Sequence, residues 1–82
     1  MMEFEIVAAI VAEHFDMDKK DITESTNILE DLNADELEAA ELIVEIESAT
    51  DIKFPDEALD DMRTVGDIAN YLAEHAEEPE AE

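Results

Sequence analysis

The 82-residue sequence contains no cysteine, no tryptophan, one glycine and two prolines. Without cysteine, the chain can form neither a disulfide nor a cysteine-ligated metal site. It also lacks a long apolar run, because the longest one, residues 6–12, is far too short to span a bilayer. No positively charged segment precedes an apolar one at the amino terminus, so a secretory signal is not expected. We therefore expect a small cytoplasmic protein.

Basic residues are equally scarce. Four lysines and arginines stand against 26 aspartates and glutamates, which gives a formal net charge of −22. This charge argues against binding nucleic acid or anionic membranes through a basic patch. It favours basic protein surfaces or metal cations as partners, and repulsion between copies favours a monomer.

High charge is typical of disordered chains, but 46% of the residues are apolar and they recur at helical spacing. The first predicted helix covers residues 3–15, and its apolar stripe consists of Phe4, Val7, Ala8, Val11 and Phe15, flanked by Ile10. Such a stripe is typical of a helix with one buried face. A long connection follows over residues 16–33, and we expect it to be anchored in the core by Ile22, Ile28 and Leu29.

A second helix is predicted over residues 36–49. Asp35 is a good N-cap, because its carboxylate can accept hydrogen bonds from the free N–H groups of the first turn. Glu38 stands three residues later, which is the spacing of a capping box. Glu36 occupies the first helical position, where the helix dipole favours an acidic side chain.

This second helix has two apolar stripes and an acidic face. The wider stripe, expected to face the core, consists of Ala39, Leu42, Ile43 and Ile46. The narrower one consists of Leu37, Ala40 and Val44, and the acids are Glu38, Glu41, Glu45 and Glu47. No lysine or arginine occurs between residues 21 and 52. Such a face suits a basic partner, although simple solvation is the alternative interpretation.

The rest of the chain predicts one short and one longer helix. Asp56 is expected to cap a short helix over residues 57–61, after Pro55 has ended the preceding segment. Thr64 is expected to cap the last helix with Asp67 as its capping-box partner, and the apolar side of that helix consists of Val65, Ile68, Leu72 and His75, joined by Tyr71. We therefore predict an all-α bundle of three main helices and one short helix over residues 1–76, followed by a flexible acidic tail over residues 77–82.

Several motifs, in this order and spacing, resemble the acyl carrier proteins over residues 3–76. The matching residues are Leu29-Glu30-Asp31-Leu32, Ala34-Asp35, Leu37, Glu41-Leu42, Glu47, Phe54-Pro55-Asp56-Glu57 and Thr64-Val65-Gly66-Asp67-Ile68. The resemblance implies a helical bundle that is not an enzyme. It also implies a role in fatty-acid or polyketide-like biosynthesis, in which the family holds acyl chains as thioesters and presents them to biosynthetic enzymes.

One position departs from the family pattern. The family motif Asp-Ser-Leu carries 4′-phosphopantetheine on its serine, whereas this chain has Asp35-Glu36-Leu37. A carboxylate cannot replace the serine hydroxyl in a phosphodiester, so no cofactor is expected on the chain as written. Glu36 has three possible roles: a helix-favouring residue, a residue that abolishes attachment, or an anionic surrogate of the phosphate. Ser25 and Ser48 are poor substitutes, because neither lies between Asp and Leu at a helix start.

The resemblance also implies a docking surface for enzymes with basic patches. The matching positions are Asp35, Leu37, Glu41, Val44 and Glu47, with Asp56 and Met62 nearby. Three functions remain open: a carrier-type protein that cannot be loaded, an interaction or regulatory module that uses the same face, and a weak buffer of divalent cations.

Metal and catalytic motifs are weak. Residues 31–35 imitate the start of a calcium loop, but the required Gly and Glu positions hold Glu36 and Leu42. Weak cation binding is still expected at Glu30, Asp31 and Asp35. His14 and His75 are the only histidines, and they lack the partners of a zinc site, so we interpret both as structural. No nucleophile and base are paired, and catalysis by this chain is not expected.

Overall fold

The apolar stripe of the first helix lies in the core, as its spacing predicts. In the computed structural model, which describes residues 2–76, helix α1 spans Met2–Phe15 and begins one residue earlier than predicted. Its buried residues are Val7, Ala8, Val11 and Ala12. The larger side chains of Phe4, Ile10 and Phe15 pack at the edge of the core.

The long connection after α1 contains the short 3-10 helix η1 (Lys19–Asp21) and a tight turn. Ile22 and Ile28 are buried, as predicted. The prediction that Leu29 anchors the core is wrong, because its side chain is 40% exposed. The turn explains this difference: Asn27 Oδ1 accepts hydrogen bonds from the N–H groups of Leu29 at 3.0 Å and Glu30 at 2.9 Å, and so holds Leu29 at the surface.

The connection is also hydrogen-bonded to the segment that leads into the last helix. The Ile28 N–H donates to Arg63 O at 2.9 Å, the Val65 N–H to Thr26 O at 2.9 Å, and the Gly66 N–H to Glu24 O at 2.8 Å. An antiparallel bridge between residues 27 and 64 is the only β-type pairing in the described part of the chain. We call this pairing of residues 24–28 with residues 63–66 the strap.

Helix α2 spans Glu36–Thr50 and so ends one residue later than predicted. Asp35 caps it as expected, because its Oδ1 accepts a hydrogen bond from the Glu38 N–H at 2.8 Å. The Glu38 carboxylate makes no hydrogen bond back to Asp35 within the described residues, so only half of the predicted capping box forms. The core side consists of Leu42, Ile43 and Ile46, while Ala39 is only partly buried.

The short helix α3 spans Asp56–Leu59 and differs from the prediction at both ends. Asp56 is the first helical residue, and the N-cap position is occupied by Pro55 with φ −67° and ψ 157°. Proline fixes φ near this value, so the chain enters the helix without a side-chain cap, and the predicted capping role of Asp56 is wrong. None of the α3 residues is buried.

Helix α4 spans Val65–Ala76 and begins with the predicted capping box of Thr64 and Asp67. Its buried face consists of Val65, Ile68, Ala69 and Leu72. His75 belongs to the predicted stripe but is only partly buried, and its ring stacks on Tyr71 with the centroids 4.0 Å apart.

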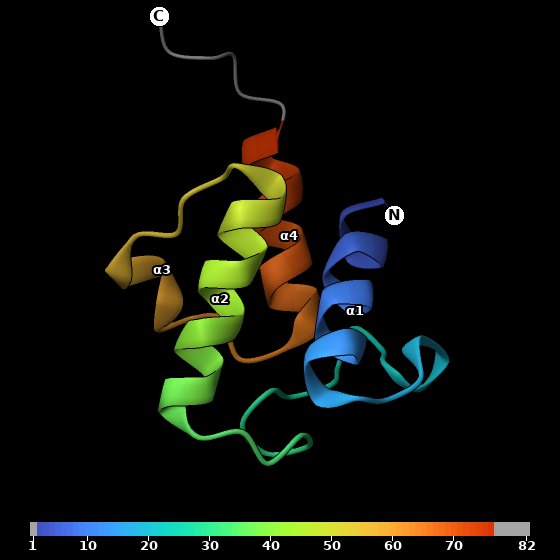
Figure 1. Ribbon diagram of the computed structural model, residues 1–82. Helices are drawn as coiled ribbons and strands as arrows, with labels where there is room; N and C mark the ends of the chain where they lie inside the picture. Colours follow the sequence, from blue (N-terminus) through green and yellow to red (C-terminus); the bar gives the residue numbers. More distant parts are fainter. Residues whose placement is uncertain (1, 77–82) are drawn as a thin grey trace, which may run out of the picture.

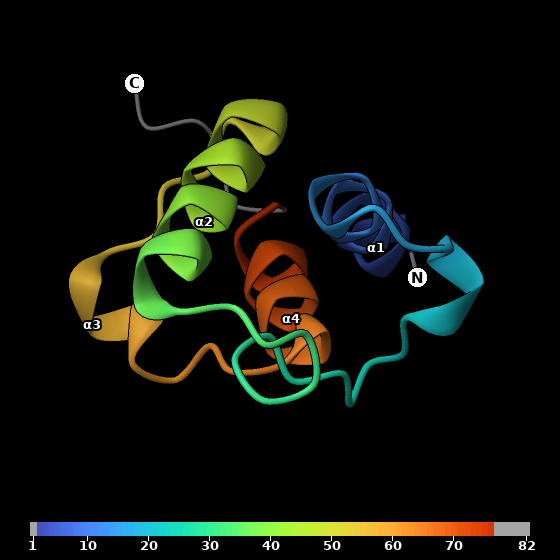
Figure 2. The same ribbon diagram turned by 60° about the horizontal axis from the view of Figure 1, so that its bottom comes forward.

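The helices form a single bundle in which α1 packs against both α4 and α2 (Figures 1 and 2). In both views α3 lies on the side of α2 that faces away from α1. The predicted all-α fold of three main helices and one short helix is therefore confirmed. The predicted tail over residues 77–82 falls outside the described residues. No helix within residues 2–76 is long and apolar enough to cross a membrane.

Candidate functional site at the start of helix α2

Position 36 lies at an exposed helix start. Glu36 is the first residue of α2, and the adjacent Asp35 side chain is used as the cap. Both side chains are exposed, so residue 36 is accessible from solvent. The local sequence explains this geometry. The Asp35 carboxylate accepts a hydrogen bond from a free N–H group of the first turn, so the Glu36 side chain is not needed for capping.

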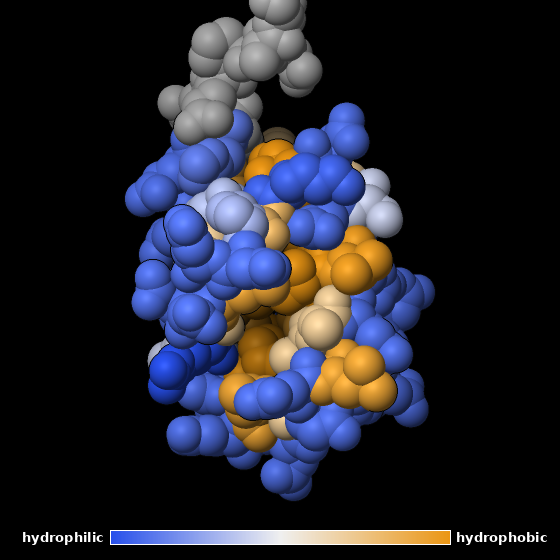
Figure 3. Space-filling model, turned by 90° about the vertical axis from the view of Figure 1, so that its left-hand side faces the viewer, coloured by the Kyte–Doolittle hydropathy of each residue, from blue (hydrophilic) through white to orange (hydrophobic). Residues whose placement is uncertain are grey.

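Glu36 also lines a cleft of about 490 Å³ between α2 and the segment that contains α3. Its apolar lining consists of Leu29, Ala39, Ala40, Ile43, Leu59 and Met62, and its charged lining consists of Glu36, Asp60 and Arg63. Figure 3 shows a hollow on this side of the molecule, surrounded by apolar side chains and bordered by hydrophilic ones. Apolar lining with a few polar groups is typical of ligand sites, and this cleft begins next to the position of the predicted attachment residue.

The narrower apolar stripe of α2 is exposed, as predicted. Leu37 is 69% exposed and Val44 is 59% exposed. Glu38 and Glu41, on the same helix, are also exposed. Asp56 is exposed at the start of α3, and Met62 is partly buried between α3 and α4. The structure thus brings most of the predicted docking positions to the surface around α2 and α3.

Two acids of α2 have partners within the fold. Glu47 Oε2 accepts a hydrogen bond from the Phe54 N–H at 2.6 Å, and this contact fixes the segment after α2. Glu45 Oε1 lies 3.1 Å from His14 Nδ1 and so connects α2 to α1. Both acids therefore make contacts that hold the fold together, and the docking role of Glu47 stays a prediction.

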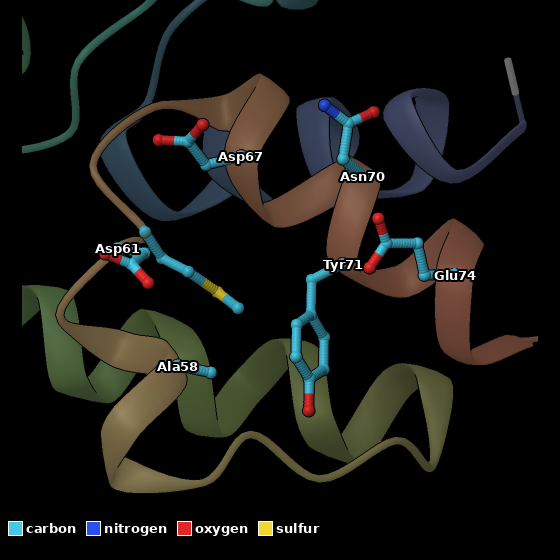
Figure 4. A pocket seen from close by; sticks show the side chains of 7 residues that line it. Ala58, Asp61, Asp67, Asn70, Tyr71 and Glu74 are labelled. Carbon is cyan, nitrogen blue, oxygen red and sulfur yellow. The ribbon is translucent and has the colours of Figure 1, made fainter.

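A second cavity, of about 300 Å³, lies between α3 and α4 (Figure 4). Asp61, Asp67 and Glu74 contribute carboxylates to its lining. Asp67 already accepts hydrogen bonds in the cap of α4, and the Tyr71 ring is stacked on both Phe54 and His75. Asp67 and Tyr71 therefore serve the fold, and the cleft beside Glu36, which begins at the candidate attachment position, is the better candidate site.

The acids expected to bind cations are partly engaged as well. Asp31 Oδ2 accepts a hydrogen bond from the Asn27 N–H at 2.8 Å, and Asp35 caps α2. In the described part of the chain, no three or more His, Cys, Asp or Glu side chains form a group that could hold a metal ion. Weak cation binding near Glu30 remains a prediction.

Comparison with known proteins shows the family of the chain. Residues 5–72 match the family described as the phosphopantetheine attachment site. The chain belongs to the acyl carrier protein family. It is 39% identical over 77 residues to an acyl carrier protein of Clostridium acetobutylicum, covering 94% of this chain and 100% of that relative. It is 42% identical over 69 residues to one of Syntrophobacter fumaroxidans, covering 84% of this chain and 85% of the relative.

Membership of this family confirms several predictions. Acyl carrier proteins are carriers in acyl biosynthesis and not enzymes, and they interact with biosynthetic enzymes. The family carries 4′-phosphopantetheine, and in this acyl carrier protein homologue the candidate attachment position holds Glu36.

Sequence reasoning did not predict the cleft, and it gave no role to three of the nine residues that line it. Leu59, Asp60 and Arg63 line it, but they follow no sequence periodicity that connects them with α2. Arg63 is one of only four basic residues in the chain, and this scarcity is the one sequence signal that distinguishes it.

Proposed function

We propose that this chain is a carrier-type protein that docks onto enzymes of fatty-acid or polyketide-like biosynthesis and that, as written, does not carry cargo. The docking surface consists of Asp35, Leu37, Glu41 and Val44 on α2, with Asp56 and Met62 beside it. The observation that supports this proposal is the exposure of Leu37 and Val44 on a helix that also presents Glu38 and Glu41 to solvent. Exposed apolar side chains rimmed by charged ones are typical of interaction sites.

The two kinds of residue have different roles in such a contact. The acids attract a basic surface, which raises the association rate and selects partners by charge. Leu37 and Val44 supply apolar area at the centre, where excluded water slows dissociation. Since Glu47 is hydrogen-bonded to Phe54, we expect its contribution to docking to act through the position of the segment after α2.

A non-carrying interaction or regulatory module is the alternative, and Glu36 is the observation that favours it. The carboxylate occupies the exposed helix start that the motif resemblance gives as the attachment position, so docking would deliver no acyl chain. The docking surface is the same in both cases. Neither function delivers an acyl chain as the sequence stands. The two functions differ in whether docking belongs to a carrier that lacks its attachment residue or to a module that regulates the bound enzyme.

Binding kinetics against a ketosynthase and a carrier-dependent transferase test the docking proposal. We expect Glu41→Lys to lower the association rate and to weaken its dependence on salt, because it reverses a steering charge. We expect Val44→Glu to raise the dissociation rate, because it places a charge in the apolar centre. Both positions are exposed, so folding stability should change by no more than about 0.5 kcal/mol.

Matched substitutions on α1 serve as controls. Glu13→Lys makes the same charge reversal as Glu41→Lys, and Ala9→Glu introduces the same acid as Val44→Glu, each at an exposed position on α1. Both controls should bind as the parent does. If the α2 variants also bind as the parent does while folded, the acidic face is merely solvated and the docking proposal fails.

A further inference from the structure

Met62 lies between the two cavities described above. It lines both the cleft of about 490 Å³ beside residue 36 and the cavity of about 300 Å³ between α3 and α4. Its side chain is partly buried and packs against the core. A water molecule needs far less space than either cavity offers. A small solute of similar size can therefore reach the Met62 side chain from two sides.

The segment that contains α3 is held by few apolar contacts. None of residues 56–59 is buried, and α3 has no side-chain cap. Between residues 56 and 62, the apolar side chains that pack against the core are those of Leu59 and Met62. Met62 thus supplies one of two contacts that hold this segment to the bundle. A change that made its side chain polar would weaken that attachment.

Met62 differs from the other methionines because it combines access with packing. The chain has no cysteine, so all of its sulfur atoms belong to four methionines. Met2 is 73% exposed at the start of α1, and its oxidation would remove little packing. Met17 packs against the core but lines neither of the two cavities. Met1 lies outside the described residues.

We propose that Met62 is a site of reversible oxidation by hydrogen peroxide, and that its sulfoxide weakens the attachment of the α3 segment to the bundle. The sulfur attacks one peroxide oxygen with a lone pair, so that an S–O bond forms as the O–O bond breaks. The departing hydroxide takes the proton of the transferred oxygen and leaves as water. The sulfur loses two electrons, and the peroxide gains them.

The charges around Met62 favour a neutral oxidant of this kind. Asp60 lines the cleft and Asp61 lines the second cavity, so a carboxylate stands on each side of Met62. Together with the net charge of −22, these groups repel anionic oxidants, whereas hydrogen peroxide is uncharged. The sulfoxide that forms is polar, and its burial without a hydrogen bond costs free energy. The proposal concerns the stability of the chain and does not rest on docking.

Peroxide treatment of the full chain, followed by mass mapping of its peptides, tests the access. We expect Met2 to gain an oxygen atom first, and Met62 to be oxidised before Met17. In the chain unfolded in urea, Met62 and Met17 should react at similar rates, which controls for intrinsic reactivity. If Met62 reacts no faster than Met17 in the folded chain, the cavities give it no special access and the proposal is wrong.

Thermal unfolding measures the consequence, after a treatment time that converts Met62 and spares most of Met17. The unfolding midpoint of the parent should fall by about 4–8 °C or more, because a polar group replaces an apolar contact. Met62→Leu is similar in volume and cannot be oxidised at this position, so its midpoint should change little on treatment. Met17→Leu is the matched control and should lose as much as the parent.

Reduction tests whether the change is reversible. A pair of methionine sulfoxide reductases, one for each sulfoxide epimer, with dithiothreitol as reductant should restore both the mass of the Met62 peptide and the midpoint. Recovery of the mass without the midpoint would contradict the proposal. So would an equal loss of midpoint in treated Met62→Leu and treated parent, or oxidation of Met62 with no loss at all. Should Met62→Leu fail to fold, the recovery of the parent after reduction decides alone.

Discussion

Thr64 and Asp67 cap α4 reciprocally. The Asp67 N–H donates to Thr64 Oγ1 at 3.0 Å, and the Thr64 N–H donates to Asp67 Oδ2 at 3.2 Å. The Arg63 N–H reaches the same carboxylate oxygen at 3.1 Å. Since residues 63–66 belong to the strap, this cap also fixes the place where the long connection meets the last helix.

Removal of the Thr64 hydroxyl should therefore destabilise the protein. Thr64→Ala leaves the Asp67 N–H without its acceptor, and loss of an N-cap side chain costs about 1 kcal/mol. For a chain of this size, that loss lowers the midpoint of thermal unfolding by roughly 4–8 °C. Differential scanning calorimetry measures the change. Thr64→Ser keeps the hydroxyl and should lose much less, and equal losses in the two variants would contradict a role for the hydrogen bond.

The caps and stripes of the main helices could be predicted because their causes are local. Asp35 and Thr64 stand next to apolar residues at helical spacing, and each satisfies N–H groups within one turn of itself. Buried positions such as Val11 and Ile46 follow from the same spacing. These features need no knowledge of the remainder of the chain.

The cleft and the strap could not be predicted, because they depend on contacts between distant residues. Nothing near Leu29 in the sequence indicates that Asn27 turns it toward the surface or that Arg63 lies beside it. Glu47 looks like another acid of the exposed face, and only the fold brings the Phe54 N–H to its carboxylate. By helix propensity alone Gly66 is a poor choice for the first turn of α4, and the close approach of Glu24 explains why glycine stands there.

The residue at the C-terminal end of α2 is unfavourable for stability. Asp51 follows the helix with φ 63°, in the left-handed region, and no basic residue stands in the last turn. A non-glycine residue is disfavoured there, and a negative charge at a helix C-terminus interacts unfavourably with the dipole. Asp51→Gly should relieve both effects and stabilise the fold by about 1 kcal/mol in urea unfolding.

Asp51→Asn separates the two effects, because it removes the charge and keeps a side chain. We expect it to recover only the electrostatic part, which is about 0.3–1 kcal/mol at low ionic strength and decreases as salt is added. If Asp51→Gly destabilises the chain, the Asp51 side chain makes a favourable contribution that outweighs its backbone conformation.

The ion pair between Lys19 and Glu5 gives a prediction for acid titration. Lys19 Nζ donates to Glu5 Oε1 at 2.8 Å, and this hydrogen bond, together with the lysine charge, lowers the pKa of the Glu5 carboxyl from its ordinary 4.5. A lowered pKa in the folded state contributes stability above the unfolded pKa, and this stability is lost as the pH falls through the folded pKa. Lys19→Gln should therefore raise the pKa of Glu5 toward 4.5 in an NMR titration.

Lys20→Gln is the matched control for this titration, since it removes one positive charge from the adjacent residue, which is also exposed. It should leave the pKa of Glu5 close to that of the parent. The difference in unfolding free energy between parent and Lys19→Gln should also diminish below the folded pKa, where the Glu5 carboxyl is protonated in both proteins. If the two lysine variants change the pKa of Glu5 equally, that pKa responds to the net charge of the chain and not to the contact with Lys19.

The last prediction concerns the candidate attachment position, residue 36. Incubation of the parent chain with a phosphopantetheinyl transferase and coenzyme A should leave its mass unchanged, because Glu36 offers no hydroxyl for a phosphodiester. Glu36→Ser should gain one phosphopantetheine group, since residue 36 is exposed at the capped start of α2 and its neighbours Asp35 and Leu37 match the family motif. Intact mass spectrometry measures both outcomes.

Glu36→Ala controls for loss of the charge and should stay unmodified. A mass increase on the parent would place the acceptor at another hydroxyl, with Ser25 and Ser48 as the first positions to replace by alanine. Failure of Glu36→Ser to gain the group, with the fold intact by circular dichroism, would show that this chain has lost recognition by the transferase as well as the acceptor.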